Sequence, residues 1–137
     1  HSQLFPDSYQ IMGWNFSDQG MELVLSPRLP ALIRQEMPEL VDRFLNENGL
    51  LREDLRSYLT HPGGAKVIDV VRETLDLQIE DLQLSEELLN AHGNISSVSV
   101  LVVLENWLKT TNTTKPGHSL LSAFGPGFSA ELLLLKV

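Results

Sequence analysis

Cysteine is absent from the 137 residues of the chain. This absence excludes a disulfide framework, a thiolate metal site and a cysteine nucleophile within this sequence. Long apolar runs are also missing. The longest, VLVVL at 100–104 and LLLL at 132–135, fall far short of the roughly 18 residues that a membrane-spanning helix needs. We therefore expect no membrane insertion.

The N-terminal stretch HSQLFPDSYQIMGW has no initiating Met, no basic segment and no apolar segment. It is therefore not a signal peptide. A cytoplasmic location is the simpler expectation for a chain without cysteine. The sequence also lacks internal repeats and interior linkers. We expect residues 1–137 to form one domain and to be a fragment of a longer chain.

Basic residues are few: 10 Lys and Arg stand against 18 Asp and Glu, giving a formal net charge of -8. Nucleic acids and anionic membrane surfaces attract positive fields, so we expect neither as the main partner. Solubility alone is a sufficient explanation for the negative net charge. Apolar residues make up 42% of the chain and charged residues 20%, values typical of a globular domain with its own core.

Apolar spacing predicts helices and strands in alternation, which indicates an α/β layered domain with a mixed sheet. Helices are expected over 31–49, 65–75, 84–93 and 96–110, and strands over 21–25, up to His61, 118–124 and 129–137. Pro38 is expected to kink or divide the first helix. Ser85 is expected to cap the third helix. Residues 110–117 are expected to form a surface loop.

Two short motifs contain the candidate polar groups. In HPGG, His61 ends a strand, and Pro62, Gly63 and Gly64 form a turn before a helix. The motif is either a turn with an incidental histidine or a place where a ligand approaches glycine backbone next to an imidazole. In GNISS, Asn94 either caps the following helix or directs its amide at a ligand.

The third motif, FGPGF at 124–128, is a tight turn between two apolar strands or one wall of a pocket. Other chemistries lack their motifs. No two of the histidines at 1, 61, 92 and 118 are spaced i, i+4, so we expect no metal site. Nucleophile-elbow, P-loop and dinucleotide-binding motifs are absent from the sequence. Trp14 and Trp107 are expected to be packing residues.

Taken in order, HPGGAKVIDVV (61–71), HGNISSVSVLVVLENWL (92–108) and LLSAFGPGFSAELLLLKV (120–137) resemble one family. It is the type III polyketide synthases: the chalcone and stilbene synthases and their bacterial alkylpyrone-type relatives. Residues 11–33 resemble the stretch that precedes these motifs in that family. The resemblance implies the second half of a thiolase-like αβαβα fold.

The resemblance also implies a site. The family uses a Cys–His–Asn triad on CoA thioesters, and His61 and Asn94 match its histidine and asparagine. The cysteine belongs to the half of the family's fold that precedes this one. The family loads an acyl group on that cysteine and extends it with malonyl-CoA by decarboxylative condensation. His61 and Asn94 would donate hydrogen bonds to the thioester oxygen. No cofactor is implied beyond the CoA thioesters themselves.

Substrate-binding residues follow from the same motifs. The resemblance assigns this role to Leu23, Gly63, Gly64, Ser96, Phe124, Gly125, Pro126 and Gly127. Leu23 stands where plant members often carry a gating phenylalanine, which implies a differently shaped cavity. Lys66 stands where plant members have a small residue. Both features resemble microbial members and favour an alkylpyrone or alkylresorcinol type of product.

The expected partners are acyl-CoA, malonyl-CoA, the N-terminal half of the same enzyme and a second copy in a homodimer. The isolated fragment is expected to be inactive and, with one face uncovered, to self-associate. Two alternatives stay open at this point. One is a stand-alone binding domain that has lost catalysis. The other is another thiolase-fold condensing enzyme such as a ketoacyl synthase, although these usually follow the histidine with polar residues.

Overall fold

The computed structural model describes residues 1–111 and 116–136. The predicted loop at 110–117 includes residues 112–115, which lie outside the described part. The elements in chain order are β1 (Ser2–Leu4), β2 (Met12–Ser17), β3 (Gly20–Leu25), α1 (Leu29–Glu47), η1 (Arg52–Asp54), β4 (Leu55–Thr60), α2 (Ala65–Leu75), η2 (Ile79–Leu82), α3 (Gln83–His92), α4 (Ser97–Thr110), β5 (His118–Gly125) and β6 (Ser129–Lys136). The turns η1 and η2 are short 3₁₀ helices.

A mixed sheet of four strands, in the order β1-β6-β5-β4, forms the centre of the molecule. Strands β5 and β6 make an antiparallel hairpin in which Leu120 pairs with Leu134. Strand β4 joins the other side of β5 in parallel, and β1 pairs antiparallel with β6. The hairpin turn contains Gly127 at φ +109°, a conformation that glycine adopts without steric cost. The mixed sheet and the helices that accompany it agree with the predicted α/β class.

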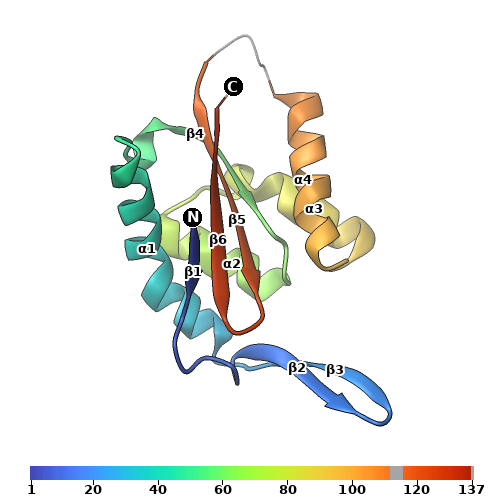
Figure 1. Ribbon diagram of the computed structural model, residues 1–137. Helices are drawn as coiled ribbons and strands as arrows, with labels where there is room; N and C mark the ends of the chain where they lie inside the picture. Colours follow the sequence, from blue (N-terminus) through green and yellow to red (C-terminus); the bar gives the residue numbers. More distant parts are fainter. Residues whose placement is uncertain (112–115, 137) are drawn as a thin grey trace.

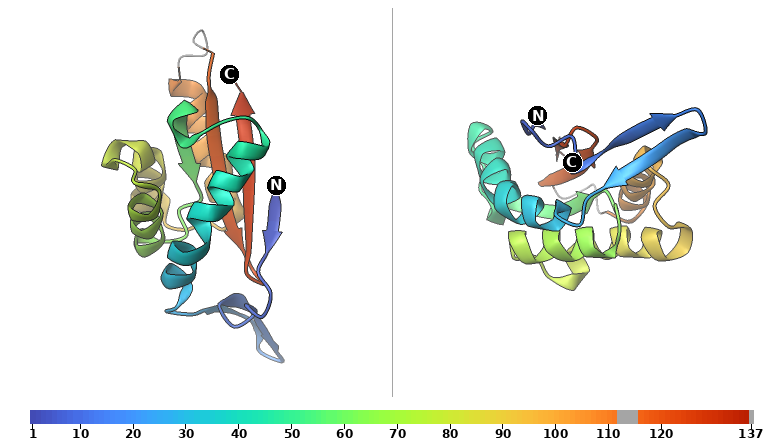
Figure 2. Two further views of the ribbon diagram at one scale, coloured as in Figure 1. Left: turned by 90° about the vertical axis from the view of Figure 1, so that its left-hand side faces the viewer. Right: turned by 90° about the horizontal axis from the view of Figure 1, so that it is seen from below.

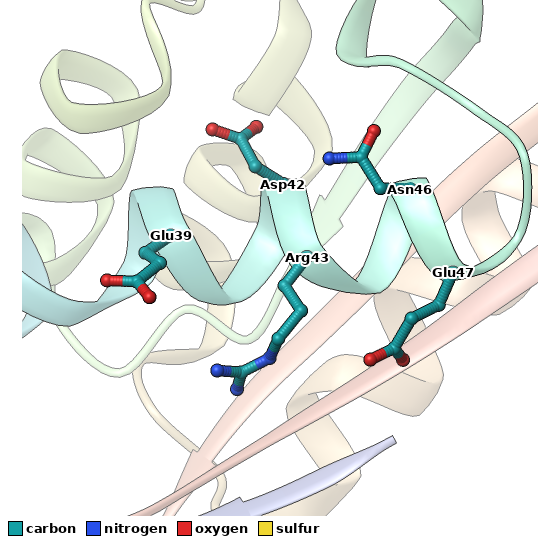
Figure 3. A pocket seen from close by; sticks show the side chains of 5 residues that line it. All are labelled: Glu39, Asp42, Arg43, Asn46 and Glu47. Carbon is teal, nitrogen blue, oxygen red and sulfur yellow. The ribbon is translucent and has the colours of Figure 1, made fainter.

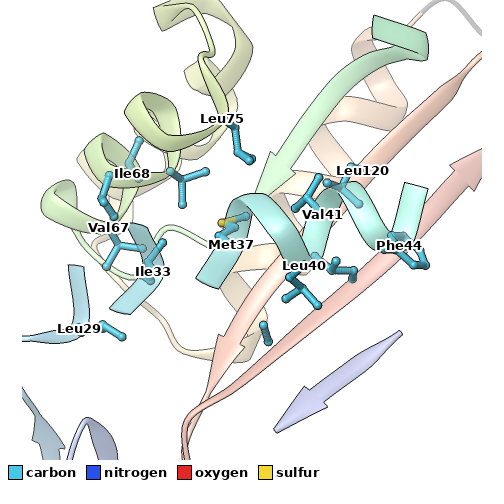
Figure 4. Packing of buried hydrophobic residues seen from close by; sticks show 14 of the residues in the cluster. Leu29, Ile33, Met37, Leu40, Val41, Phe44, Val67, Ile68, Leu75 and Leu120 are labelled. Atoms are coloured by element: carbon cyan, nitrogen blue, oxygen red, sulfur yellow. The ribbon is translucent and has the colours of Figure 1, made fainter. Parts of the chain in front are cut away.

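Helices cover both faces of the sheet (Figure 1). Because side chains alternate along a strand, Leu120 enters the core beneath α1 and α2, whereas Leu121 enters a second core beneath α3 and α4. Figure 4 shows Ile33 and Met37 of α1 directed toward α2, where Ile68 lies. The two cores make the domain a helix–sheet–helix sandwich.

Helix α1 runs without interruption through Pro38, so the expectation that this residue divides the helix is wrong. An interior proline costs about 3 kcal/mol. The helix buries seven apolar side chains on both sides of it: Leu29, Ile33, Met37, Leu40, Val41, Phe44 and Leu45. Each buried side chain of this size contributes about 1.5–3 kcal/mol. Packing therefore outweighs the lost backbone bond.

Strands β2 and β3 form a separate two-stranded ribbon that projects away from the sheet (Figures 1 and 2). Cross-strand partners put six apolar side chains on one face: Met12, Trp14, Phe16, Met21, Leu23 and Leu25. Trp14 is 43% exposed and Phe16 75%. Of the two expected packing residues, Trp107 is 6% exposed and packs in the second core, whereas Trp14 lies outside both cores, opposite Leu23 on the ribbon. We call these six residues the apolar ribbon face.

Ser85 is not the cap of α3. It lies inside the helix, is buried, and donates a hydrogen bond of 2.7 Å to the Thr60 carbonyl at the end of β4. The helix begins two residues earlier, at Gln83. The sequence pattern of a serine before two glutamates fits a cap equally well, but burial against β4 decides the outcome.

We predict that Ser85→Ala destabilises the protein by about 1–3 kcal/mol, because the buried Thr60 carbonyl loses this donor. Urea unfolding measures the change. Ser97→Ala, at an exposed serine that opens α4, is the control and should stay within about 0.5 kcal/mol of the parent. Equal stabilities of the two variants would contradict the structural role of Ser85.

We predict that the isolated chain self-associates through its uncovered apolar surface. Phe16 on the ribbon and Leu101 on α4, 75% and 60% exposed, are its test positions. Phe16→Glu with Leu101→Glu should lower the sedimenting mass toward that of a monomer without lowering the melting temperature. Leu51→Glu, at an exposed leucine in a turn, should leave the mass unchanged. A monomeric parent chain would refute the prediction.

Candidate active site

His61 is anchored at the point where β4 ends. Its backbone N–H donates to the Ser122 carbonyl of β5 over 2.8 Å, which extends the parallel pairing by one residue beyond β4. The side chain is 7% exposed. Its Nδ1 atom is buried and has no hydrogen-bond partner among the described residues. A buried polar atom without a partner is costly, which points to a partner supplied from elsewhere.

The turn behind His61 leads directly into α2. The Gly63 N–H donates to the His61 carbonyl over 2.9 Å, and the Gly64 carbonyl accepts the first helical bonds, from Val67 and Ile68. Gly64 has φ +157°, a conformation that other residues rarely adopt. At Gly63 a Cβ atom would lie 3.7 Å from Cδ2 of His61. The ring edge of His61 therefore borders bare glycine backbone.

Asn94 joins this turn from the other motif. Its Nδ2 donates to the Gly63 carbonyl over 3.1 Å, and its Oδ1 accepts from the Ser96 N–H over 2.9 Å. Asn94 is therefore not the cap of α4, whose N-cap position belongs to Ser96. Because an amide nitrogen carries two hydrogens, one N–H of Asn94 remains for a ligand.

Ser96 adopts φ +60° and ψ −145°, a backbone conformation largely restricted to glycine that costs another residue roughly 1–3 kcal/mol. Its carbonyl accepts the Ser99 N–H over 2.9 Å, and the Ser99 hydroxyl accepts the Ile95 N–H over 3.0 Å. These bonds stabilise the sharp turn that leads from α3 into α4. They hold Asn94 over the HPGG turn.

A buried polar network beneath His61 was missed by the sequence analysis. The hydroxyls of Thr60 and Ser122 lie 3.1 Å apart, and the Thr60 carbonyl accepts the hydroxyl of Ser85. All three residues are buried. The available signal was a hydroxyl residue inside each of two apolar strands, LTH and LLSAF. The network joins β4, β5 and α3 directly beneath the candidate site.

Burial lowers the pKa of the His61 imidazole below its usual value. Desolvation disfavours the charged form, and no carboxylate in the described part of the chain offsets this effect. Among the described residues the structure holds no group of three His, Cys, Asp or Glu side chains that could bind a metal ion. The site therefore offers a neutral imidazole, a carboxamide and glycine backbone.

A cavity of about 450 Å³ lies beside the glycines. One wall consists of Gly63, Gly64 and the first turn of α2, and the opposite wall consists of the end of β3 and the start of α1. Within the described part of the chain, Lys66 is the one charged residue in its lining. A larger hollow of about 780 Å³, shown in Figure 3, is lined by residues of α1 alone and holds none of the predicted site residues.

Leu23 and residues 124–127 do not line the glycine cavity. Leu23 pairs with Trp14 on the apolar ribbon face. The Phe124 ring stacks on Phe128 at 5.5 Å, and the Gly127 N–H donates to the Met12 carbonyl over 2.8 Å. The structure thus brings His61, Gly63, Gly64, Asn94 and Ser96 together. The other predicted residues lie against or on the ribbon.

The sheet order and the helices on both of its faces define a thiolase-like type of α/β domain. The model of the chalcone and stilbene synthases, C-terminal domain, matches residues 1–137, and the chain belongs to that family. It shares the thiolase-like fold of the type III polyketide synthases. This membership sets aside the ketoacyl synthase alternative.

The chain is 37% identical over 134 residues to the 1,3,6,8-tetrahydroxynaphthalene synthase of Streptomyces peucetius subsp. caesius, covering 97% of this chain and 35% of that protein. It superimposes on the crystal structure of PKS-I from the brown alga Ectocarpus siliculosus with a TM-score of 0.91 at 30% identity, covering 98% and 37% of the two chains.

The 1,3,6,8-tetrahydroxynaphthalene synthase of Streptomyces coelicolor A3(2), a bacterial type III polyketide synthase, gives a TM-score of 0.90 at 27% identity, with 98% and 38% covered. The chain therefore spans a little over a third of the length of these relatives. No helix in the described ranges 1–111 and 116–136 is long and apolar enough to cross a membrane.

We predict that the chain loses stability as the pH falls below about 6.5, the ordinary pKa of histidine. Burial makes the pKa of His61 lower in the folded than in the unfolded state. As the pH falls below about 6.5, the unfolded state therefore binds the proton first, and the free energy of unfolding decreases. Stability is full above the unfolded pKa. Urea unfolding at pH 5.5 and 7.5 measures the difference, which His61→Gln should reduce. An unchanged pH difference in that variant would refute the prediction.

Proposed function

We propose that this chain is the C-terminal part of a type III polyketide synthase that condenses malonyl-CoA with an acyl thioester. The observation that carries the proposal is the hydrogen bond from Asn94 Nδ2 to the Gly63 carbonyl. It brings the carboxamide of one motif to the turn that follows His61 in the other motif. Family membership over the whole chain supports it.

In the proposed reaction a cysteine from the rest of the enzyme is the nucleophile. His61 takes the thiol proton, and the lowered pKa of the imidazole supplies the neutral ring that can accept it. The resulting imidazolium is stabilised by the thiolate beside it. The thiolate attacks the acyl-CoA carbonyl, a carbon–sulfur bond forms, and the thiol of coenzyme A leaves with a proton.

Extension then follows on the same residues. Malonyl-CoA loses carbon dioxide, and the electron pair of the broken carbon–carbon bond becomes an enolate. The enolate carbon attacks the acyl thioester and expels the cysteine thiolate. Negative charge gathers on the thioester oxygens in both steps. His61 is neutral again once its proton has left on the coenzyme A thiol, and a neutral imidazole keeps one N–H. This ring N–H and the free N–H of Asn94 are the donors that stabilise the charge.

The remaining parts of the proposal concern what surrounds this chain. The N-terminal half of the enzyme supplies the cysteine, so the chain by itself is inactive in condensation. The active enzyme is a homodimer, it uses CoA thioesters and no other cofactor, and Leu23 with the turn at 124–127 completes the walls of its cavity. The apolar ribbon face, uncovered here, supports a covering partner of this kind.

We predict that His61→Ala and Asn94→Ala, made in the full-length protein, each lower the rate of condensation about 100- to 1,000-fold, because each removes one oxyanion donor. Incorporation of radiolabelled malonyl-CoA measures the rate. His92→Ala and Asn90→Ala, at exposed residues of α3, are the matched controls and should retain the parental rate.

Full activity in either site variant would remove that residue from the mechanism, and full activity in both would refute the proposal. The intact mass of the natural gene product distinguishes the proposed enzyme from the alternative, a stand-alone binding domain. A mass near 15.3 kDa would mean a stand-alone domain without a nucleophile. A mass more than twice as large, with an upstream cysteine, would agree with the proposed enzyme.

A further inference from the structure

Lys66 occupies an unusual electrostatic position. Of the described residues, it is the one charged side chain lining the cavity beside Gly63 and Gly64, in a chain whose net charge is -8. Among the described residues it takes part in none of the ion pairs. Its carboxylate neighbour one turn along α2, Asp69, is bound by Arg72 at 2.9 Å. The Lys66 ammonium is thus available to an anion.

The backbone around Lys66 reinforces this charge. Ala65 and Lys66 are the first two residues of α2, where backbone N–H groups have no intrahelical partner and the helix dipole is positive. The cavity runs along this turn and reaches Gly63, whose backbone borders the His61 ring. The wall that holds the exposed cation therefore continues to the glycine that borders the buried imidazole, whose Nδ1 has no partner among the described residues.

We propose that Lys66 binds the phosphate end of the coenzyme A thioester and so determines the preference of this enzyme for phosphorylated thioester carriers. The inference rests on the proposed function. A thioester carbonyl at His61 places the uncharged pantetheine arm between the glycines and the apolar wall of Leu25, Pro27 and Leu29. The arm leaves the cavity past the first turn of α2, where the phosphates meet the ammonium.

The role is one of positioning and specificity, since Lys66 touches the carrier and not the reacting atoms. We therefore expect Lys66→Gln, made in the full-length protein, to raise KM for malonyl-CoA about tenfold. This is the lower end of what one charge-assisted hydrogen bond contributes. The kcat should remain unchanged. Lys66→Arg keeps the charge and should retain most of the affinity.

The decisive comparison uses malonyl-pantetheine, which has the same arm and thioester but no phosphate. Its KM should be the same for Lys66→Gln and for the parent, and added salt should weaken malonyl-CoA binding more in the parent than in the variant. Lys109→Gln, at an exposed lysine of α4 paired with Glu105, is the control for lost charge elsewhere. Equal changes of KM for both thioesters, or no change for malonyl-CoA, would overturn the inference.

A second measurement separates this inference from the proposed reaction. Calorimetric titration of free coenzyme A into the His61→Ala protein reports binding without turnover. Weaker binding in His61→Ala with Lys66→Gln than in His61→Ala alone supports the role of Lys66 even if no condensation is found. Identical binding overturns that role even if condensation is active. Malonyl-3′-dephospho-CoA, which keeps the diphosphate but lacks the 3′-phosphate, then tells which phosphate Lys66 binds. Lys66→Gln should still raise its KM if Lys66 binds the diphosphate, and should leave its KM unchanged if Lys66 binds the 3′-phosphate.

Discussion

The hydrogen bond from Asn94 to the Gly63 carbonyl is the constraint on which the candidate site depends. It connects residues 31 positions apart, and it connects the start of α2 with the turn before α4. These helices pack on opposite faces of the sheet, so their N-terminal ends have no shared core to hold them together. The side-chain amide of Asn94 connects these two helix ends at the candidate site.

His61 is held from a different direction. The Thr60, Ser85 and Ser122 network fixes the end of β4 to β5 and α3, and the His61 N–H continues the pairing with β5. Buried polar groups are costly unless they are hydrogen-bonded. Here the hydrogen bonds also fix the course of the backbone from Thr60 into His61. The imidazole is consequently carried by backbone that is bonded to β5 and α3, and its ring edge borders Gly63.

Much of this fold follows from sequence spacing. The helix at 65–75 and the β5–β6 hairpin were predicted with nearly the observed bounds, because apolar periodicity and the glycine turn point the same way. The ribbon strand β2 was missed because it contains Gly13 and Asn15, residue types depleted in strands, and because Trp14 and Phe16 are not buried within this chain. Ser85 was misplaced because burial against β4, a tertiary effect, competes with a cap pattern. The contact between HPGG and GNISS could not be predicted from the residues alone, because Gly63 and Asn94 are 31 positions apart and meet only in the folded chain.

The two tryptophans differ in a way that turns the chain into its own optical reporter. Trp107 is a buried residue of α4, whereas Trp14 lies on the apolar ribbon face. Indole emission depends on polarity, and collisional quenchers reach only exposed rings. Quenching by acrylamide therefore follows the covering of the ribbon through Trp14, while the unquenched emission follows the integrity of the core through Trp107. Assembly with any covering partner and global unfolding are spectroscopically separable in the unlabelled protein.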